Sequence, residues 1–167
     1  MPRVRRLFRH LSCDYWTVRR AFPAAVLDRI EARVATEEQR HDGEIRFAVE
    51  AALPLRDYFA GMTARDRAVQ LFSRLRVWDT EHNAGVLIYV LLADRRVEIV
   101  ADRGIHARVG TQAWETICGE MQRAFGAGRF EQGALLGIGA ISDLIATHFP
   151  PRPDNPNELP DRPVVVR

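Results

Sequence analysis

Residues 79–110 read DTEHNAGVLIYVLLADRRVEIVADRGIHARVG and contain two apolar segments separated by a short polar turn. The first segment, residues 85–92, has almost no polar side chain, which is typical of a strand covered on both faces. Asp94 and two arginines interrupt the apolar run, and residues 97–101 resume it as a half-buried strand. This stretch therefore predicts a β-hairpin with its turn at Asp94.

The rest of the chain shows helical and strand patterns in turn. Apolar residues recur at helical spacing over residues 24–34, 63–75, 111–125 and 130–149, whereas residues 44–50 alternate as a strand does. Thr63 and Asp66 have the spacing of a helix capping box. Helices between strands favour packing on the faces of a sheet. We therefore predict an α/β fold, a three-layer α/β/α sandwich with a small mixed sheet, and one further short strand in residues 51–60 or near Arg108.

The 167 residues suit one domain with a single core. Residues 1–20 form a basic N-terminal arm with six arginines against Asp14, and we expect a solvated, partly helical segment there. Residues 21–149 form the folded domain. Residues 150–167 are a proline-rich C-terminal tail without periodicity, which predicts an extended, weakly ordered segment.

Composition narrows the choice of partners. A net charge of +2 and the absence of an RNA-binding or phosphate-loop motif predict that the chain has no nucleic-acid partner. No apolar run approaches the roughly 20 residues of a transmembrane helix, and Asp14 interrupts what would be the apolar core of a signal peptide, so a cytoplasmic location is expected. The basic arm leaves open contact with an anionic membrane surface or with an unknown protein partner.

Polar residues at one end of the predicted hairpin are the first candidates for a site. Asp79, Glu81 and Asn83 precede the first strand, and Asp102 follows the second. Because hairpin strands run in opposite directions, these four residues share one end of the ladder and Asp94 lies at the other. Carboxylate and amide oxygens are the ligands that Ca²⁺ and Mg²⁺ prefer. The four residues are therefore the predicted metal ligands.

Two further hypotheses concern the same end of the predicted hairpin. His82 is the candidate proton carrier beside these carboxylates, with His106 as a second choice. Glu50 would join the site only if its strand runs parallel to residues 97–101. The alternative is that the acids are loop residues and helix caps facing nearby cations, which are Arg76, Arg103 and Arg108.

Several motifs together resemble the TPM domain family. They are the segment HNAGVLIYV at residues 82–90, the turn and strand DRRVEI at residues 94–99, DRGI at residues 102–105 and GRFEQG at residues 128–133. The resemblance extends from about residue 20 to residue 149. It implies an α/β/α sandwich, and it implies a family in which acid phosphatase activity, calcium binding and photosystem repair have been assigned to relatives.

Two functions follow from the residues and the resemblance. The first is a binding or scaffold module with a divalent-cation site, Ca²⁺ or Mg²⁺, at the end formed by residues 79–83 and 102. The alternative is a metal-assisted phosphomonoester hydrolase in which His82 carries the proton. These residues do not decide whether the chain is an enzyme.

Overall fold

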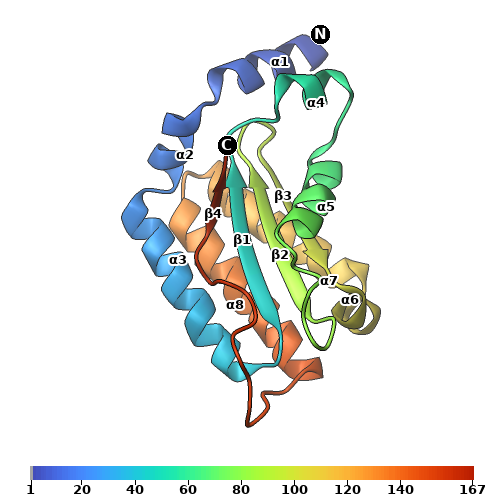
Figure 1. Ribbon diagram of the computed structural model, residues 1–167. Helices are drawn as coiled ribbons and strands as arrows, with labels where there is room; N and C mark the ends of the chain where they lie inside the picture. Colours follow the sequence, from blue (N-terminus) through green and yellow to red (C-terminus); the bar gives the residue numbers. More distant parts are fainter. Residues whose placement is uncertain (1) are drawn as a thin grey trace.

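The computed structural model describes the backbone of residues 2–167 and the side chains from Val4 onward. The elements, in chain order, are α1 (Pro2–Ser12), α2 (Tyr15–Ala21), α3 (Ala24–Glu37), the 3-10 turn η1 (Glu38–Arg40), β1 (Glu44–Glu50), α4 (Leu55–Phe59), α5 (Ala64–Arg74), β2 (Gly85–Leu91), β3 (Arg96–Ala101), α6 (Arg103–Val109), α7 (Thr111–Gly126), α8 (Phe130–His148) and β4 (Val164–Val166). Figure 1 shows the helices arranged around one central sheet.

The sheet has the order β3-β2-β1-β4. The predicted hairpin is confirmed, because β2 and β3 pair antiparallel from Val86 opposite Ala101 to Leu91 opposite Arg96. Strand β1 runs parallel to β2, and β4 runs parallel to β1. The sheet therefore has a loop end, where β1 and β2 begin and β3 finishes, and a turn end, where β1 and β2 finish beside the Asp94 turn.

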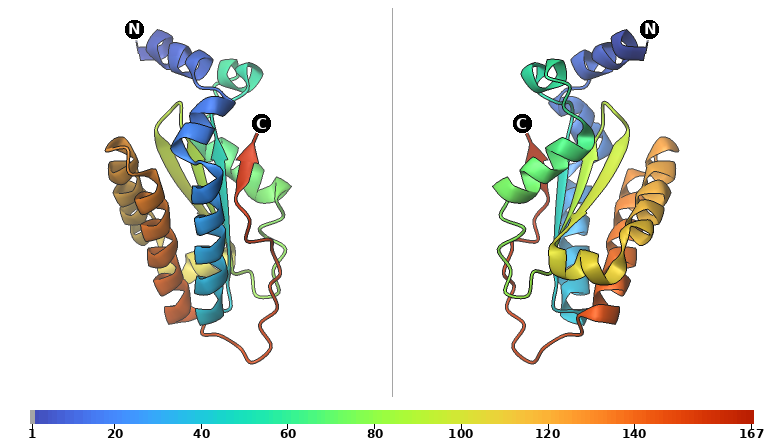
Figure 2. Two further views of the ribbon diagram at one scale, coloured as in Figure 1. Left: turned by 90° about the vertical axis from the view of Figure 1, so that its left-hand side faces the viewer. Right: turned by 90° about the vertical axis from the view of Figure 1, so that its right-hand side faces the viewer.

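Both faces of the sheet are covered. Alternate residues of β1, such as Phe47 and Val49, share one apolar cluster with α3, α7 and α8, whereas Ala48 joins Leu87 and Tyr89 in a second cluster with α5. Figure 2 shows the sheet edge-on between these layers. The predicted α/β/α sandwich with a small mixed sheet is thus the observed fold.

The sequence pattern did not show all of the local structure. The tail was predicted to be extended, and within it residues 164–166 form β4 on the edge of β1 and Leu159 is buried. A three-residue edge strand is too short to show a period, so the sequence pattern could not reveal it. The prediction of a further strand in residues 51–60 or near Arg108 was wrong. Leu55–Phe59 form helix α4, and the region near Arg108 is helix α6, whose first turn Asp102 caps.

The N-terminal arm consists of two helices. A capping box formed by Asp14 and Thr17 starts α2, in the same way that Thr63 and Asp66 start α5 as predicted. The arm packs along the domain and reaches α4 at the turn end of the sheet (Figure 1). Within residues 2–167, no helix combines the length and the apolar character needed to cross a bilayer.

Candidate functional site

At the loop end, Asp79 and Glu81 lie in the segment that joins α5 to β2. Asp79 pairs with Arg76, its Oδ2 lying 3.6 Å from Nε, and both side chains are largely exposed. Glu81 pairs with Arg152 of the tail at 3.2 Å. The pairing of Asp79 agrees with the alternative that these acids face nearby arginines. The partner of Glu81 comes from the C-terminal tail, for which no role was predicted.

Asp102 differs from these two acids because it is buried. Its Oδ1 accepts a hydrogen bond from the backbone N–H of Arg103 at 2.6 Å, which caps α6. Its Oδ2 is buried and has no hydrogen-bond partner among the described residues. The first turn of α6 also lies against the backbone of the loop, since a Cβ on Gly104 would come within 2.7 Å of the Asn83 carbonyl oxygen. Asp102 and Asn83 thus lie near each other at the loop end of the sheet.

His82 has a carboxylate partner, but not one of the predicted acids. Its Nδ1 lies 2.9 Å from Oδ2 of Asp42, and Oδ1 of Asp42 lies 2.8 Å from Nε of Arg152. Because Arg152 also binds Glu81, the four side chains form one continuous chain of polar contacts. The parallel pairing of β1 and β2 explains this arrangement, since Asp42 precedes β1 just as His82 precedes β2. His106 is exposed on α6.

The four predicted ligands therefore share the loop end but carry different contacts. No group of three or more histidine, cysteine or acidic side chains with metal-binding geometry occurs among the described residues. Asp102 offers one buried carboxylate oxygen, while Asp79 and Glu81 point to arginines. A metal site at Asp79, Glu81, Asn83 and Asp102 stays a prediction.

A second group of acids lies beneath the tail. Glu38 accepts a hydrogen bond from the Ile45 N–H at 2.7 Å, and Glu44 accepts two from the N–H groups of residues 158 and 159. Burial, followed by the charge of Glu44, raises the pKa of Glu38 to about 9. Glu38, Glu44 and Asp161 line a cavity of about 440 Å³ that the tail partly closes. This cluster fastens the tail onto β1.

Glu50 does not belong to the loop end. Its strand is parallel to β2 and therefore antiparallel to β3, so the condition for its joining the site fails. At the turn end its carboxylate binds Arg67 at 2.7 and 2.9 Å and accepts a hydrogen bond from the Tyr89 hydroxyl at 2.6 Å. Burial and the Glu50 charge raise the pKa of Tyr89. All three groups are buried, so this is an internal polar clamp.

Asp94 anchors the N-terminal arm. Arg6 of α1 donates two hydrogen bonds to its carboxylate, at 2.8 and 2.7 Å, and His10 Nε2 lies 3.0 Å from Oδ1. His10 Nδ1 accepts the Leu53 N–H at 3.1 Å, so the ring proton is on Nε2 and is donated to Asp94. The turn residue of the sequence prediction is thus the docking point of α1.

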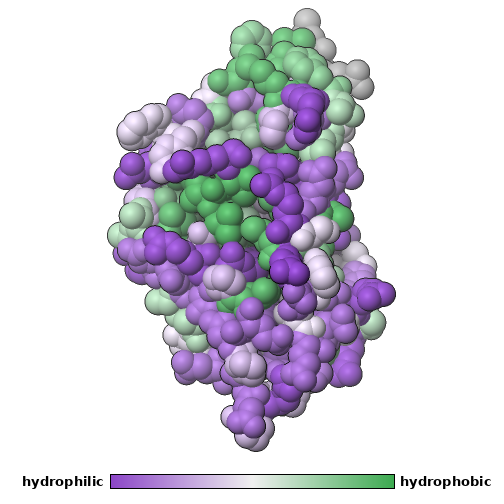
Figure 3. Space-filling model, in the orientation of Figure 1, coloured by the Kyte–Doolittle hydropathy of each residue, from purple (hydrophilic) through white to green (hydrophobic). Residues whose placement is uncertain are grey.

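Helices α1 and α4 present apolar side chains to solvent. Figure 3 shows apolar residues gathered over these two helices at the turn end. The residues that make up this surface, here called the α1–α4 patch, are Val4, Phe8, Leu11, Leu55 and Phe59, and each is between 47% and 71% exposed. This surface lies at the opposite end of the sheet from the predicted metal ligands.

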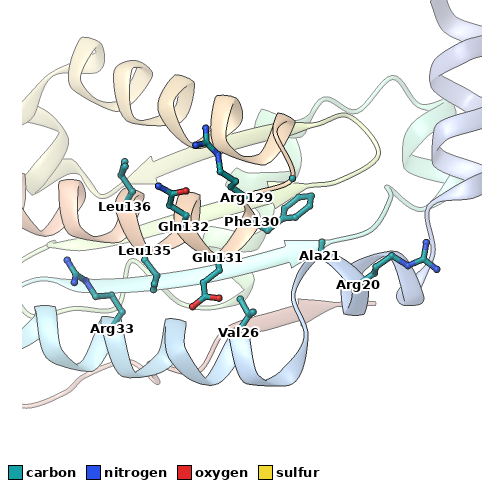
Figure 4. Close-up of a pocket in the computed structure, with 11 residues that line it drawn as sticks. Arg20, Ala21, Val26, Arg33, Arg129, Phe130, Glu131, Gln132, Leu135 and Leu136 are labelled. Carbon is teal, nitrogen blue, oxygen red and sulfur yellow. The ribbon is translucent and has the colours of Figure 1, made fainter.

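A broad groove of about 750 Å³ runs between α3 and α8. Figure 4 shows Arg33, Arg129 and Glu131 around a floor that includes Val26 and Leu135, with Arg20 directed away from the others. Arg33 is paired with Glu37 at 2.7 Å, and Glu131 is paired with Arg29. Much of the charge around this groove is therefore neutralised by neighbouring side chains.

Comparison with known proteins identifies the family. The TPM domain matches residues 20–144, so the chain belongs to the TPM domain family. The NMR structure of the BA42 protein from the psychrophilic bacterium Bizionia argentinensis is 30% identical, covers 87% of this chain and 95% of its own, and superposes with a TM-score of 0.77. The N-terminal domain of a protein from P. gingivalis has the same fold at 17% identity, with a TM-score of 0.61 and coverage of 77% and 81%. No curated protein matches the chain.

Proposed function

We propose that this TPM-domain protein is a binding module and that the α1–α4 patch is its docking surface. The observation that carries the proposal is the exposure of five large apolar side chains on two adjoining helices. Contiguous exposed apolar surface on a folded protein marks a site of interaction. The patch is not a loose terminus, because Arg6 and His10 fasten α1 to Asp94.

Site-specific photocross-linking in cells tests this function. A photoreactive phenylalanine replaces Phe8 or Phe59, and control variants carry it at Val69 and Leu136, which are exposed apolar residues on other surfaces. We expect adducts from positions 8 and 59 that positions 69 and 136 do not form. Equal labelling at all four positions would contradict the proposal.

A second candidate is the metal-assisted phosphomonoester hydrolase at the loop end. Two observations support it. Asp102 holds a buried carboxylate oxygen without a partner, and Asp42 orients His82 through Nδ1 while Nε2 has no partner among the described residues. Asp42 thus holds His82 as a positioned proton carrier. A bound Ca²⁺ or Mg²⁺ would polarise a phosphoryl oxygen.

Thermal unfolding in calcium, magnesium or manganese tests this candidate, because a ligand bound only by the folded chain raises the melting temperature. We expect the rise to disappear in Asp102→Asn and to persist in Asp143→Asn, an exposed acid elsewhere. If the melting temperature does not rise and p-nitrophenyl phosphate is not hydrolysed, the hydrolase function is excluded and the binding module remains as the proposed function.

A further inference from the structure

Helix α1 has two opposite faces. Arg6 and His10, four residues apart, point inward to the Asp94 carboxylate. Val4, Phe8 and Leu11 recur at intervals of four and three residues and all lie in solvent. A helix of a globular domain ordinarily buries its apolar stripe against the core. Here the core-facing contacts are polar and the apolar stripe faces outward.

Helix α4 continues the same surface. The Tyr58 ring lies 4.9 Å from the His10 ring, centroid to centroid, and the Arg6 guanidinium lies 5.0 Å from the Tyr58 ring. These contacts hold α4 beside α1, as all the views agree (Figures 1 and 2). With Tyr58 turned inward, Leu55 and Phe59 remain exposed. Two helices therefore present one continuous apolar area.

The exposed charged side chains of α1 and α4 among the described residues are arginines. Arg5 and Arg9 on α1 are exposed and have no carboxylate partner among the described residues, and Arg56 on α4 is almost fully exposed. The acids below the patch are already engaged, since Asp94 binds Arg6 and His10 and Asp57 lies beside arginines. The surface thus offers apolar side chains beside exposed arginines, and two of these, Arg5 and Arg9, have no carboxylate partner among the described residues.

We propose that the α1–α4 patch docks on an anionic lipid surface, an assignment that rests on the proposed function. Helices of this kind lie in the membrane interface, with apolar residues at the acyl boundary and arginines at the headgroups. On α2, Tyr15 and Trp16 are 41% and 65% exposed, and such aromatic residues favour the membrane–water interface. A symmetric dimer through the patch would bring the arginines of both copies together, which disfavours self-association.

Vesicle co-sedimentation of the full chain tests the assignment. The vesicles contain phosphatidylcholine, with or without phosphatidylglycerol. We expect binding to the anionic vesicles and at least about a 10-fold loss for each of Phe8→Ser and Phe59→Ser. Arg5→Ala combined with Arg9→Ala should weaken binding about 30-fold, and added salt should weaken it further. Val69→Ser and Leu136→Ser serve as matched controls, and unchanged melting temperatures show that the variants fold.

Several outcomes would overturn the lipid assignment. Failure of the wild-type chain to bind anionic vesicles, equal binding to neutral vesicles, or undiminished binding by Phe8→Ser with Phe59→Ser would each do so. Sedimentation velocity shows whether the patch instead joins two copies. If vesicles do not bind but positions 8 and 59 still form specific adducts, the docking surface stands without the lipid. If neither occurs, the proposed function fails as well.

Discussion

The two ends of the central sheet differ in how their charges are used. At the loop end, Asp42, Glu81, His82 and Arg152 bind one another, so acids and bases largely neutralise each other near the surface. At the turn end, Asp94 and Glu50 form ion pairs with inward-facing arginines. The outer surface there has exposed apolar side chains and arginines without a carboxylate partner among the described residues. The end that the sequence marked by its acids therefore pairs most of them internally, apart from one buried oxygen of Asp102, whereas the end that was predicted as a turn carries exposed apolar side chains.

The comparison of the two ends distinguishes polar residues that stabilise the fold from exposed residues that are available to a partner. A buried charge with its hydrogen bonds made contributes to the uniqueness of the fold, and an exposed apolar side chain contributes little to it. Substitutions at the two ends should consequently have different effects on stability.

The largest expected effect is that of Glu50→Ala at the turn end. Removal of this carboxylate leaves the buried guanidinium of Arg67 without its ion pair. We expect the free energy of unfolding to fall by about 3–5 kcal/mol, as measured by urea denaturation. Glu115→Ala, an exposed acid on α7, should change it by no more than about 0.5 kcal/mol. A loss below about 1 kcal/mol in Glu50→Ala would show that the clamp is not important for stability.

Asp94→Ala should have the next largest effect, a loss of about 2–3 kcal/mol, because hydrogen bonds from Arg6 and His10 to a charged acceptor disappear. Trypsin should also cleave α1 faster. Asp79→Ala at the loop end is the matched control and should change neither measurement. Unaltered cleavage of α1 in Asp94→Ala would mean that Asp94 does not hold the arm.

The same contact predicts a pH dependence. Burial acts to raise the pKa of Asp94, but the hydrogen bonds from Arg6 and His10 outweigh it and hold that pKa below its ordinary value. The stabilisation is therefore present above the unfolded carboxyl pKa of about 3.9 and is lost as the pH falls through the lower folded value. Cleavage of α1 by an acid-active protease should accelerate in that acidic range.

Glu38→Gln should act in the opposite direction at the loop end. Since the pKa of Glu38 rises from 4.5 to about 9 on folding, its stabilising contribution is complete below 4.5 and declines as the pH rises toward 9. The amide retains an oxygen that can accept the Ile45 N–H. We expect Glu38→Gln to be more stable than the wild-type chain at pH 8 by at least about 1.4 kcal/mol. Thermal melts across this pH range should be flatter for the variant, and a melting temperature below that of the wild type at pH 8 would contradict the expectation.

The smallest expected effect on stability is that of Arg152→Ala, because Arg152 and Glu81 are substantially exposed to solvent and Asp42 keeps its contact with His82. The same variant frees Glu81 and Asp42. If the loop end takes a cation, calcium titration should show tighter binding in Arg152→Ala than in the wild-type chain. Weaker binding would mean that the arginine supports the site rather than competing with it.

Much of the fold could be predicted from the amino-acid pattern. The apolar run at residues 85–92 indicates a strand buried on both faces, and the alternation at residues 44–50 indicates a strand. Both patterns follow from the geometry of a strand, in which successive side chains point to opposite faces. The capping box at Thr63 and Asp66 is equally local. The resemblance to the TPM domain rested on motifs in and after the hairpin and on residues 128–133, and it is confirmed by the family match.

The candidate site was predictable only in part. Antiparallel pairing within the hairpin was enough to bring Asp102 to the end that holds Asn83. The partner of His82 could not be predicted. Asp42 reaches His82 only through the parallel pairing of β1 with β2, and the direction of that pairing is set by packing across the whole sheet. Arg152 arrives through a tail whose strand spans three residues.

The sequence by itself therefore determined the periodic elements and the sandwich, because both depend on the local spacing of apolar residues, and the resemblance of its motifs indicated the family. Only the tertiary structure decided which face of α1 is free. The stripe formed by Val4, Phe8 and Leu11 is visible in the sequence, and a helix with such a stripe ordinarily turns it inward. Here Asp94, more than 80 residues away, binds Arg6 and His10 instead, so the polar face is buried and the apolar face remains exposed.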